Sequence, residues 1–169
     1  MVAFYLESVF LRQFPEKSGV GVMSRRLARE TALQVLFQKD LAEIDPAQAL
    51  DFTCAEFAVP ETSKVFASRL VSGTLAHLEE IDNMIRPVAK EWNIERMAAV
   101  DRNILRLAAY ELFFCEDIPG NVTVNEAIEL AKTFSGEDAG KFVNGILGVL
   151  VTQAKKPSQP PGQEPGGRE

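Results

Sequence analysis

The segment Asn121-Val-Thr-Val-Asn-Glu-Ala-Ile-Glu-Leu-Ala-Lys132 is followed ten residues later by Phe142-Val-Asn-Gly-Ile-Leu147. The two segments indicate short helices that meet at a tight junction, because Ser135-Gly136 between them is typical of a helix end. An amphipathic helix does not require polar residues such as Asn125 and Glu126 at these places. The order of residues is therefore more particular than a helical fold alone demands.

Helical periodicity extends over most of the chain. Apolar residues recur every three or four positions and no segment alternates convincingly with period two, which predicts an all-α fold. Asp45-Pro46 supplies an N-cap followed by proline at the first helical position, and Asn93 can cap a later helix. Thr123 and Glu126 form a capping-box pattern. The expected helices cover about residues 25–44, 46–59, a long segment after Pro60 that Pro87 ends or kinks, 94–115, 123–135 and 138–154.

The two ends of the chain differ from this helical region. Residues 1–23 form an N-terminal extension that lacks the basic start and cleavage site of a signal peptide. Met23 lies directly before Ser24, a good N-cap, and is an alternative start of translation; the other interpretation is a genuine, loosely attached extension. Residues 155–169 are rich in Pro, Gly and Gln with almost nothing to bury, which predicts a disordered tail.

The composition excludes several classes of protein. Apolar residues make up 46% and charged residues 25% of the 169 residues, as in an ordinary globular domain. No apolar run approaches the roughly 20 residues needed to cross a bilayer. The net charge of −6 argues against an unselective nucleic-acid binder, although arginines gather at residues 24–29. Cys54 and Cys115 lack a metal-ligand spacing, so we expect reduced core residues of a cytoplasmic protein.

A catalytic site is not expected. The only histidine, His77, lies within a helical pattern, where a surface or boundary position is more common than a catalytic base. No serine or cysteine belongs to a motif with a positioned base, and no glycine-rich loop joins a strand to a helix. The sequence therefore predicts neither an enzyme nor a resident metal or cofactor.

Three further motifs stand in a characteristic order with the opening segment. They are Arg25-Arg-Leu-Ala-Arg-Glu30, Trp92-x-x-x-Arg96 and Asp101-Arg-Asn-Ile-Leu-Arg-Leu-Ala-Ala-Tyr-Glu-Leu112. In order and spacing the chain resembles the NusB family of bacterial antitermination factors over about residues 24–154. The resemblance implies two packed three-helix bundles, with halves at about residues 24–86 and 87–154.

The first motif places three arginines together. Arg25, Arg26 and Arg29 fall within an arc of roughly 100° at the start of a helix, and a helix N-terminus itself favours phosphate. Spacing alone leaves open a second interpretation, a solvated charged helix start. Guanidinium groups bind phosphate bidentately and stack on unpaired bases. The resemblance implies that these three arginines contact RNA.

Other candidate RNA-binding residues lie in the second half. Arg102 and Arg106 line one side of a helix, where they either continue the RNA surface or pair with acids such as Glu111. An aromatic residue and a lysine flank the junction of the last two helices, where a base could stack and a phosphate could rest. Without the resemblance, such a phenylalanine is more often a core residue. The resemblance places three residues of this junction at the RNA surface: Phe134, Asp138 and Lys141.

Asp101 is unusual because it shares an arc with apolar residues, where a bare carboxylate is costly to bury. Two interpretations remain open: an internal pair with Arg102 or Arg69, or a contact with a donor from a partner. The resemblance implies that an acid at this place and an aromatic residue of the first helix face the ribosomal protein NusE. Phe37 holds the aromatic position, where some relatives carry a tyrosine that adds a hydroxyl hydrogen bond.

The resemblance implies a transcription antitermination factor. Such a factor binds the boxA element of nascent ribosomal RNA transcripts together with NusE and joins the RNA polymerase complex, without a cofactor or a membrane. One rival is the RNA-binding helical module of an RNA cytosine methyltransferase, which needs a catalytic domain far larger than the segment after Ala154. The other rival is a homodimeric interaction protein that hides its RNA surface.

Overall fold

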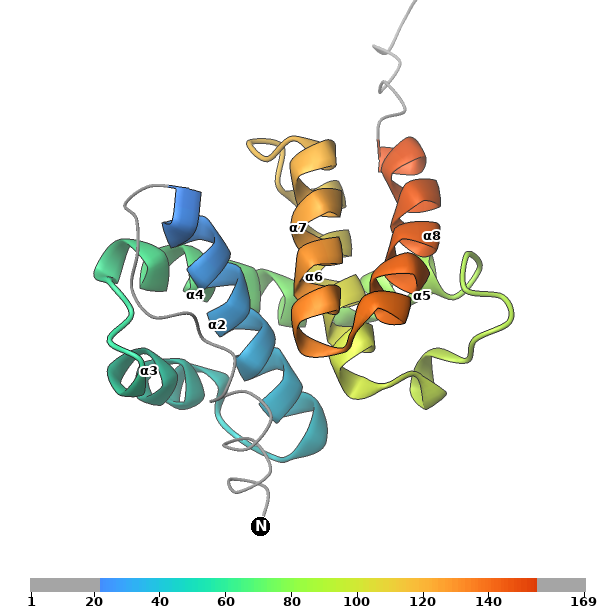
Figure 1. Ribbon diagram of the computed structural model, residues 1–169. Coiled ribbons are helices and arrows are strands. Elements are labelled where there is room, and N and C mark those ends of the chain that lie inside the picture. The colour runs from blue at the N-terminus through green and yellow to red at the C-terminus, as the bar shows by residue number, and fades with distance from the viewer. Residues whose placement is uncertain (1–21, 155–169) are drawn as a thin grey trace, which may run out of the picture.

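The computed structural model describes residues 22–154, with side chains from Arg25 onward, and the regular secondary structure of this part is all helical (Figure 1). The expected all-α fold is confirmed. The expectations for residues 1–21 and for the tail concern residues outside the described part. Helix α2 already begins at Val22, so the expected N-cap at Ser24 was wrong and the last two residues assigned to the extension belong to this helix. The helices are α2 (Val22–Leu41), α3 (Pro46–Glu56), α4 (Glu61–Ala76), α5 (Leu78–Ile85), α6 (Ala99–Phe114), α7 (Gly120–Phe134) and α8 (Glu137–Ala154), with a 3₁₀ turn at Ile94–Arg96.

The helices form two groups that meet at α6. In the first group, α2 packs against α3 and α4, and in the second α7 packs against α8 and both contact α6 (Figure 1). Helix α6 also contacts α2, α4 and α5. Helix α5 lies before the expected boundary at residue 87 but packs mainly on α6, so the division of the chain into halves stays a prediction.

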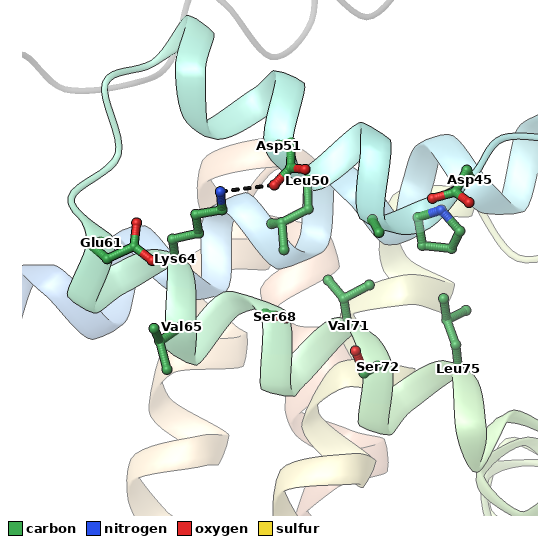
Figure 2. A pocket seen from close by; sticks show the side chains of 12 residues that line it. Asp45, Leu50, Asp51, Glu61, Lys64, Val65, Ser68, Val71, Ser72 and Leu75 are labelled. Atoms are coloured by element: carbon green, nitrogen blue, oxygen red, sulfur yellow. Dashed lines mark ion pairs between the residues drawn. The ribbon is translucent and has the colours of Figure 1, made fainter.

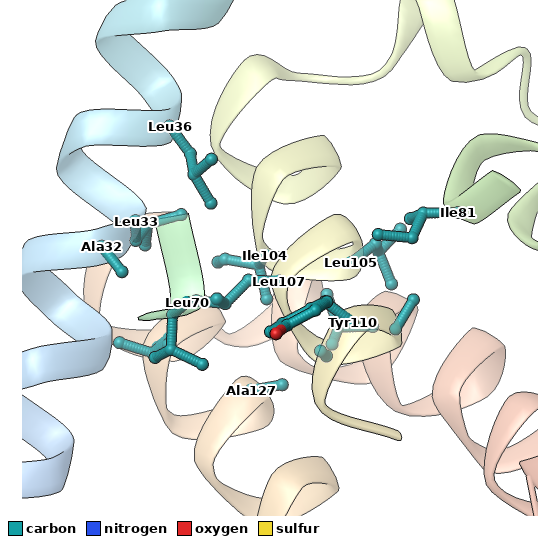
Figure 3. Packing of buried hydrophobic residues seen from close by; sticks show 14 of the residues in the cluster. Ala32, Leu33, Leu36, Leu70, Ile81, Ile104, Leu105, Leu107, Tyr110 and Ala127 are labelled. Atoms are coloured by element: carbon teal, nitrogen blue, oxygen red, sulfur yellow. The ribbon is translucent and has the colours of Figure 1, made fainter. Parts of the chain in front are cut away.

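The core runs without interruption through both groups (Figure 3). Leu33 of α2, Leu70 of α4 and Leu105 of α6 are completely buried. Each leucine or isoleucine removed from water in this way contributes about 1.5–3 kcal/mol. The interface between the groups is therefore part of the core and holds α6 in place against both.

The long third helix expected up to Pro87 is in fact two helices, and this part of the prediction was wrong. The break is at His77, whose backbone (φ −111°, ψ 20°) leaves the helical region between α4 and α5. The His77 ring stacks on Phe114 with ring centroids 4.0 Å apart, and this contact accompanies the turn. Helix α5 then ends at Ile85, so that Pro87 follows a helix end as expected. His77 is a boundary residue, with a side chain 36% exposed.

The expected fourth helix is interrupted at its start. Asn93 is a cap as predicted, and its side chain accepts a hydrogen bond of 3.0 Å from the amide of Glu95, but it caps a 3₁₀ turn. Met97 is extended (ψ 150°), and α6 begins only at Ala99. The Arg102 guanidinium donates to the carbonyl oxygen of Met97 (3.2 Å), which satisfies a backbone group that the interruption leaves without a helical partner.

The caps near α7 agree only in part with the sequence. Helix α7 begins at Gly120 after Pro119, so Thr123 lies inside the helix and the expected capping box with Glu126 was wrong. The Thr123 hydroxyl instead donates to Glu111 (3.3 Å). The end of α7 is as expected, because Gly136 adopts the positive φ of 109° that favours glycine there.

One buried ion pair joins the helices of both groups. Arg29 Nη2 lies 2.6 Å from Glu111 Oε1 and Arg29 Nε lies 3.0 Å from Oε2, with the two side chains only 3% and 2% exposed. Thr123 of α7 adds a hydrogen bond to the same carboxylate, and the Arg29 guanidinium lies 5.5 Å from the ring centroid of Phe66 in α4. Buried charges are tolerated when they are paired and hydrogen-bonded, as both are here.

Replacing Gly73 by alanine should destabilise the fold. A Cβ at Gly73 would overlap the Tyr110 ring, which is itself packed in the core. We expect a loss of about 1–3 kcal/mol in the free energy of unfolding, measured by urea denaturation. Gly148→Ala in α8 is the matched control, because nothing lies within 4 Å of its Cβ. Its helix propensity should raise stability by up to about 1 kcal/mol, and equal effects at both glycines would contradict this packing.

Removing one member of the buried ion pair should lower the stability of the fold far more than removing both members. Glu111→Leu leaves the Arg29 charge without its partner and is expected to cost about 3–5 kcal/mol of unfolding free energy. The double variant Arg29→Met/Glu111→Leu should recover most of this loss, because no charge then remains buried. Thermal melting of the two single variants and the double variant gives the coupling energy. Additive losses would show that the two side chains act independently.

Candidate nucleic-acid interface

Two of the three N-terminal arginines lie on the surface at the start of α2. Arg25 is exposed, and its guanidinium lies 5.0 Å from the ring centroid of Phe66, a distance at which cation–π attraction orients the side chain. Arg26 is 47% exposed and forms a bidentate pair with Glu126 of α7, with Nε–Oε2 of 3.0 Å and Nη2–Oε1 of 2.9 Å. These contacts hold two cations at one edge of the molecule.

The charge near Arg26 depends on a third carboxyl group, Glu30. Burial raises the pKa of Glu30 to about 7, with Arg26 lowering it and Glu126 raising it further. The hydrogen bond from Arg26 lowers the pKa of Glu126, which therefore stays ionised at neutral pH. Near pH 7 a large fraction of Glu30 is neutral, and the surface around Arg25 and Arg26 is then more positive than the residue count suggests.

Arg29 does not belong to this surface. The sequence predicted an RNA contact for it together with Arg25 and Arg26, but its side chain is buried and its guanidinium is occupied by Glu111. The arc of roughly 100° on the helix therefore divides between solvent and core. The prediction for Arg29 requires correction, since a phosphate could reach it only after the core opened.

Arg102 and Arg106 are also occupied by internal partners. Arg102 Nη2 lies 2.6 Å from Asp40 Oδ2, and Arg106 binds Asp82 through Nε and Nη2 at 2.8 Å each. Their side chains are only 12% and 11% exposed. Burial alone would raise the pKa of Asp40, but hydrogen bonds from Arg102 and Asn103 hold it below its ordinary value. The internal pairing that the sequence left open is therefore present, with Asp40 and Asp82 instead of Glu111.

The junction between α7 and α8 presents two of its three candidates. Phe134 is 8% exposed and belongs to the hydrophobic core, so the structure does not place its ring where a base could stack. Asp138 and Lys141 are exposed in the first two turns of α8. Of the candidate RNA-binding residues, four are thus on the surface: Arg25, Arg26, Asp138 and Lys141.

Asp101 has neither of the internal partners proposed for it. Arg69 pairs with Asp117 (Nη2–Oδ1 2.6 Å), and this hydrogen bond lowers the pKa of Asp117 to about 2. Arg102 pairs with Asp40. Asp101 Oδ1 is buried without a hydrogen-bond partner among residues 22–154, which leaves the carboxylate able to accept a bond from outside the chain. Phe37 is only 6% exposed, so its ring lies mainly in the core and offers little surface to a partner.

A cavity lies elsewhere, between α3 and α4 (Figure 2). It holds about 550 Å³ and is lined by apolar side chains such as Leu50 and Val71 and by an ion pair of 2.8 Å between Lys64 and Asp51. None of its polar side chains forms a nucleophile with a base. Within the described part of the chain, no group of three histidine, cysteine, aspartate or glutamate residues could hold a metal ion.

The cysteines and the helix lengths within residues 22–154 bear on two further expectations from composition. Cys54 and Cys115 are both free and buried, as predicted, and burial raises the pKa of each thiol. None of the helices in this range is long and apolar enough to cross a membrane. Sequence reasoning did not identify Glu126 as the partner of Arg26 or the contact between the rings of Trp92 and Phe142. The sequence pointed to these contacts only through Glu126, a polar residue that an amphipathic α7 does not require, and through Trp92, which belongs to one of the motifs.

Comparisons with known proteins agree with this architecture. The transcription antitermination protein NusB of Pelotomaculum thermopropionicum is 56% identical over 129 residues, which cover 76% of this chain and 90% of that protein. The NusB protein of Heliobacterium modesticaldum is 53% identical over 134 residues, and the match covers 79% of this chain and 65% of that protein. A crystal structure of antitermination factors NusB and NusE in complex with dsRNA is similar at a TM-score of 0.72 and 32% identity, covering 79% of this chain and 99% of that one.

The NusB family model matches residues 26–151, a range that begins in α2 and ends within α8. It therefore includes both groups of helices, Arg26 and the junction between α7 and α8, and it begins directly after Arg25. On this match and on the identity to its relatives, the chain belongs to the NusB family.

Proposed function

We propose that this protein is a transcription antitermination factor that binds the boxA element of nascent ribosomal RNA transcripts together with the ribosomal protein NusE. The relatives named as antitermination proteins support this function, as does the similar NusB chain solved with NusE and dsRNA. The observation that carries the proposal is the exposed arginine pair at the start of α2. The work is recognition in the cytoplasm, within an RNA polymerase complex, and it requires no cofactor.

Arg25 and Arg26 suit phosphate binding for a physical reason. A guanidinium that is already oriented loses little conformational freedom when it binds a phosphate bidentately. Phe66 orients Arg25 from α4. Glu126 of α7 orients the exposed Arg26 through Nε and Nη2, so Nη1 of Arg26 is the donor that faces no described carboxylate. On a chain with a net charge of −6, such a patch attracts RNA locally while the rest of the surface repels it. Lys141 of α8 is a further cation for the same RNA.

The NusE contact is proposed at Asp101, at the start of α6. Its carboxylate lies in the first turn of that helix and makes no ion pair within the described residues, unlike the neighbouring Arg102. Phe37 lies in the core, so we propose that it stabilises the position of α2 and makes little direct contact with NusE. Two modest contacts, one with RNA and one with protein, reinforce each other when both partners are joined in one complex.

Replacing Arg25 and Arg26 together by alanine should weaken the binding of labelled boxA RNA. Two lost phosphate contacts should lower the slope of log K against log salt by about 1.4, at roughly 0.7 per phosphate on single strands. Arg29 stays unchanged because it is part of the core. Fluorescence anisotropy at several salt concentrations measures the slope, and circular dichroism confirms that the helices remain.

Lys39→Ala is the matched control for this double variant. Lys39 is also a cation of α2, but it lies about 20 Å from Arg26 at about 1.5 Å per residue, and it forms an ion pair with the exposed Glu43. Its removal should leave the salt slope unchanged. A double variant with the slope of the unmodified protein would remove the start of α2 from the RNA surface.

Replacing Asp101 by asparagine should weaken NusE binding and leave stability unchanged. The substitution keeps the shape and removes the charge, and loss of one member of a desolvated charged pair typically costs about 2–5 kcal/mol of binding. Isothermal titration with NusE measures the affinity, and calorimetric melting measures stability. Glu56→Gln on α3, an exposed acid, is the control. A lower melting temperature with intact NusE binding would refute the interface assignment.

A further inference from the structure

The cavity between α3 and α4 is an elongated groove that follows most of α4 (Figure 2). The residues of α4 that line it extend from Glu61 to Leu75, a length of about 21 Å at roughly 1.5 Å per residue. Leu50 and Val71 are buried in it, whereas Val65 at one end is 62% exposed. A groove of this length accommodates about four turns of helix or about six extended residues. Its shape and its apolar lining therefore suit a segment of polypeptide.

The polar residues of the groove are mainly acidic. Asp45, Asp51 and Glu61 line it, and Lys64 is the only cation among the lining residues. Lys64 already pairs with Asp51 at 2.8 Å, so the lining as a whole carries a net negative charge. Opposite charges across an interface favour the matching partner. The groove is therefore expected to bind an apolar segment that also contains a basic residue.

The start of α2 lies beside one end of this groove. The Arg25 guanidinium lies 5.0 Å from the ring centroid of Phe66, and Phe66 directly follows Val65 on α4. The chain therefore enters α2, at Val22, close to the exposed end of the groove. Residues 15–21 come directly before this point and span at most about 25 Å when they are extended. The residues before this connection can thus reach the groove of their own molecule.

Residues 2–14 have the composition that the groove requires. They lie outside the described part of the chain and outside the range 26–151 that the family model matches. Their two charged residues, Glu7 and Arg12, are of opposite sign, like the acids and the lysine of the groove. Large apolar side chains in water are favourably covered by other apolar surface. The segment contains three phenylalanines and two leucines: Phe4, Phe10, Phe14, Leu6 and Leu11.

We propose that residues 2–14 bind in the groove between α3 and α4 of their own chain, with apolar side chains against Val65 and with Arg12 at the acidic rim. The connection to α2 keeps the segment near the groove at an effective concentration of the order of millimolar, so even a weak contact is occupied. A partner protein or a second copy of the chain would have to displace it. The interaction is separate from the proposed RNA contact of Arg25 and Arg26.

Limited digestion of the full chain with trypsin tests this binding, because Arg12 lies within the segment and Lys17 lies in the connection. Trypsin reaches Arg12 only when the segment leaves the groove, so the rate of cleavage reports the unbound fraction. Mass spectrometry should show cleavage after Arg12 that is about tenfold or more slower than in a synthetic peptide of residues 1–21, which the burial of one large apolar side chain already accounts for. Cleavage after Lys17 should be similar in both.

Two substitutions in the full chain test the two sides of the contact. Val65→Glu places a charge against the apolar segment, and Phe10→Glu places one against the apolar groove. Each should raise the rate of cleavage after Arg12 by about tenfold or more. Val65 is exposed in the fold, so Val65→Glu should leave the helical circular dichroism unchanged.

Phe52→Glu is the matched control for Val65→Glu. Phe52 of α3 is 69% exposed and does not line the groove. The substitution therefore adds the same charge to an equally exposed apolar position outside the contact. Its effect on cleavage after Arg12 should be negligible, and a rate as high as that of Val65→Glu would overturn the assignment to the groove.

The other contrary results are also distinct. Cleavage after Arg12 at the rate of the free peptide would overturn the proposal. Protection that persists in Val65→Glu would show that the segment binds elsewhere, and protection that is lost on dilution would show that it binds a second copy; either result overturns binding in this groove of the same chain. A protein from its source cell that begins at Met23 would overturn it as well. None of these outcomes bears on RNA binding, which the Arg25 and Arg26 variants test.

Discussion

The buried pair of Arg29 and Glu111 is the contact on which the arrangement of the helices depends. It joins α2 to α6, takes a hydrogen bond from α7 and lies against an aromatic ring of α4. A charged pair without water is stable only when its geometry is good, so it constrains the relative positions of these helices. Because Arg25 and Arg26 are on the preceding turn of the same helix, this constraint also determines where the exposed guanidinium groups point.

A second set of ion pairs, with partly buried side chains, repeats this use of arginine in α6. Arg102 forms an ion pair with Asp40 of α2, and Arg106 forms one with Asp82 of α5, on one side of the helix. Arg102 also donates hydrogen bonds to carbonyl groups of the interrupted turn. The arginines of this motif therefore form internal ion pairs instead of a basic surface. Asp101, one residue earlier, has no such partner among residues 25–154, and the contrast supports a role for it in binding a partner.

The exposed side chains that we propose for RNA recognition are few and lie on helices. Arg26 pairs with Glu126, Arg25 lies over Phe66, and Lys141 is on α8. Side chains that are already oriented lose little freedom on binding, so a small set can bind RNA with useful affinity. Glu30, whose pKa is about 7, makes the charge of this region sensitive to pH near neutrality.

The sequence by itself determined the helical class, the family and the local ends of helices such as those at Asp45 and Gly136. These features depend on neighbouring residues and on motif order. Only the tertiary structure decided that Arg29 is buried while Arg26 is exposed, and that the helix before Pro87 breaks at His77. The partner of Arg29 is 82 residues away in the chain, and that of Arg26 is 100. Helical periodicity says which residues share a face, but not which acid of another helix that face meets.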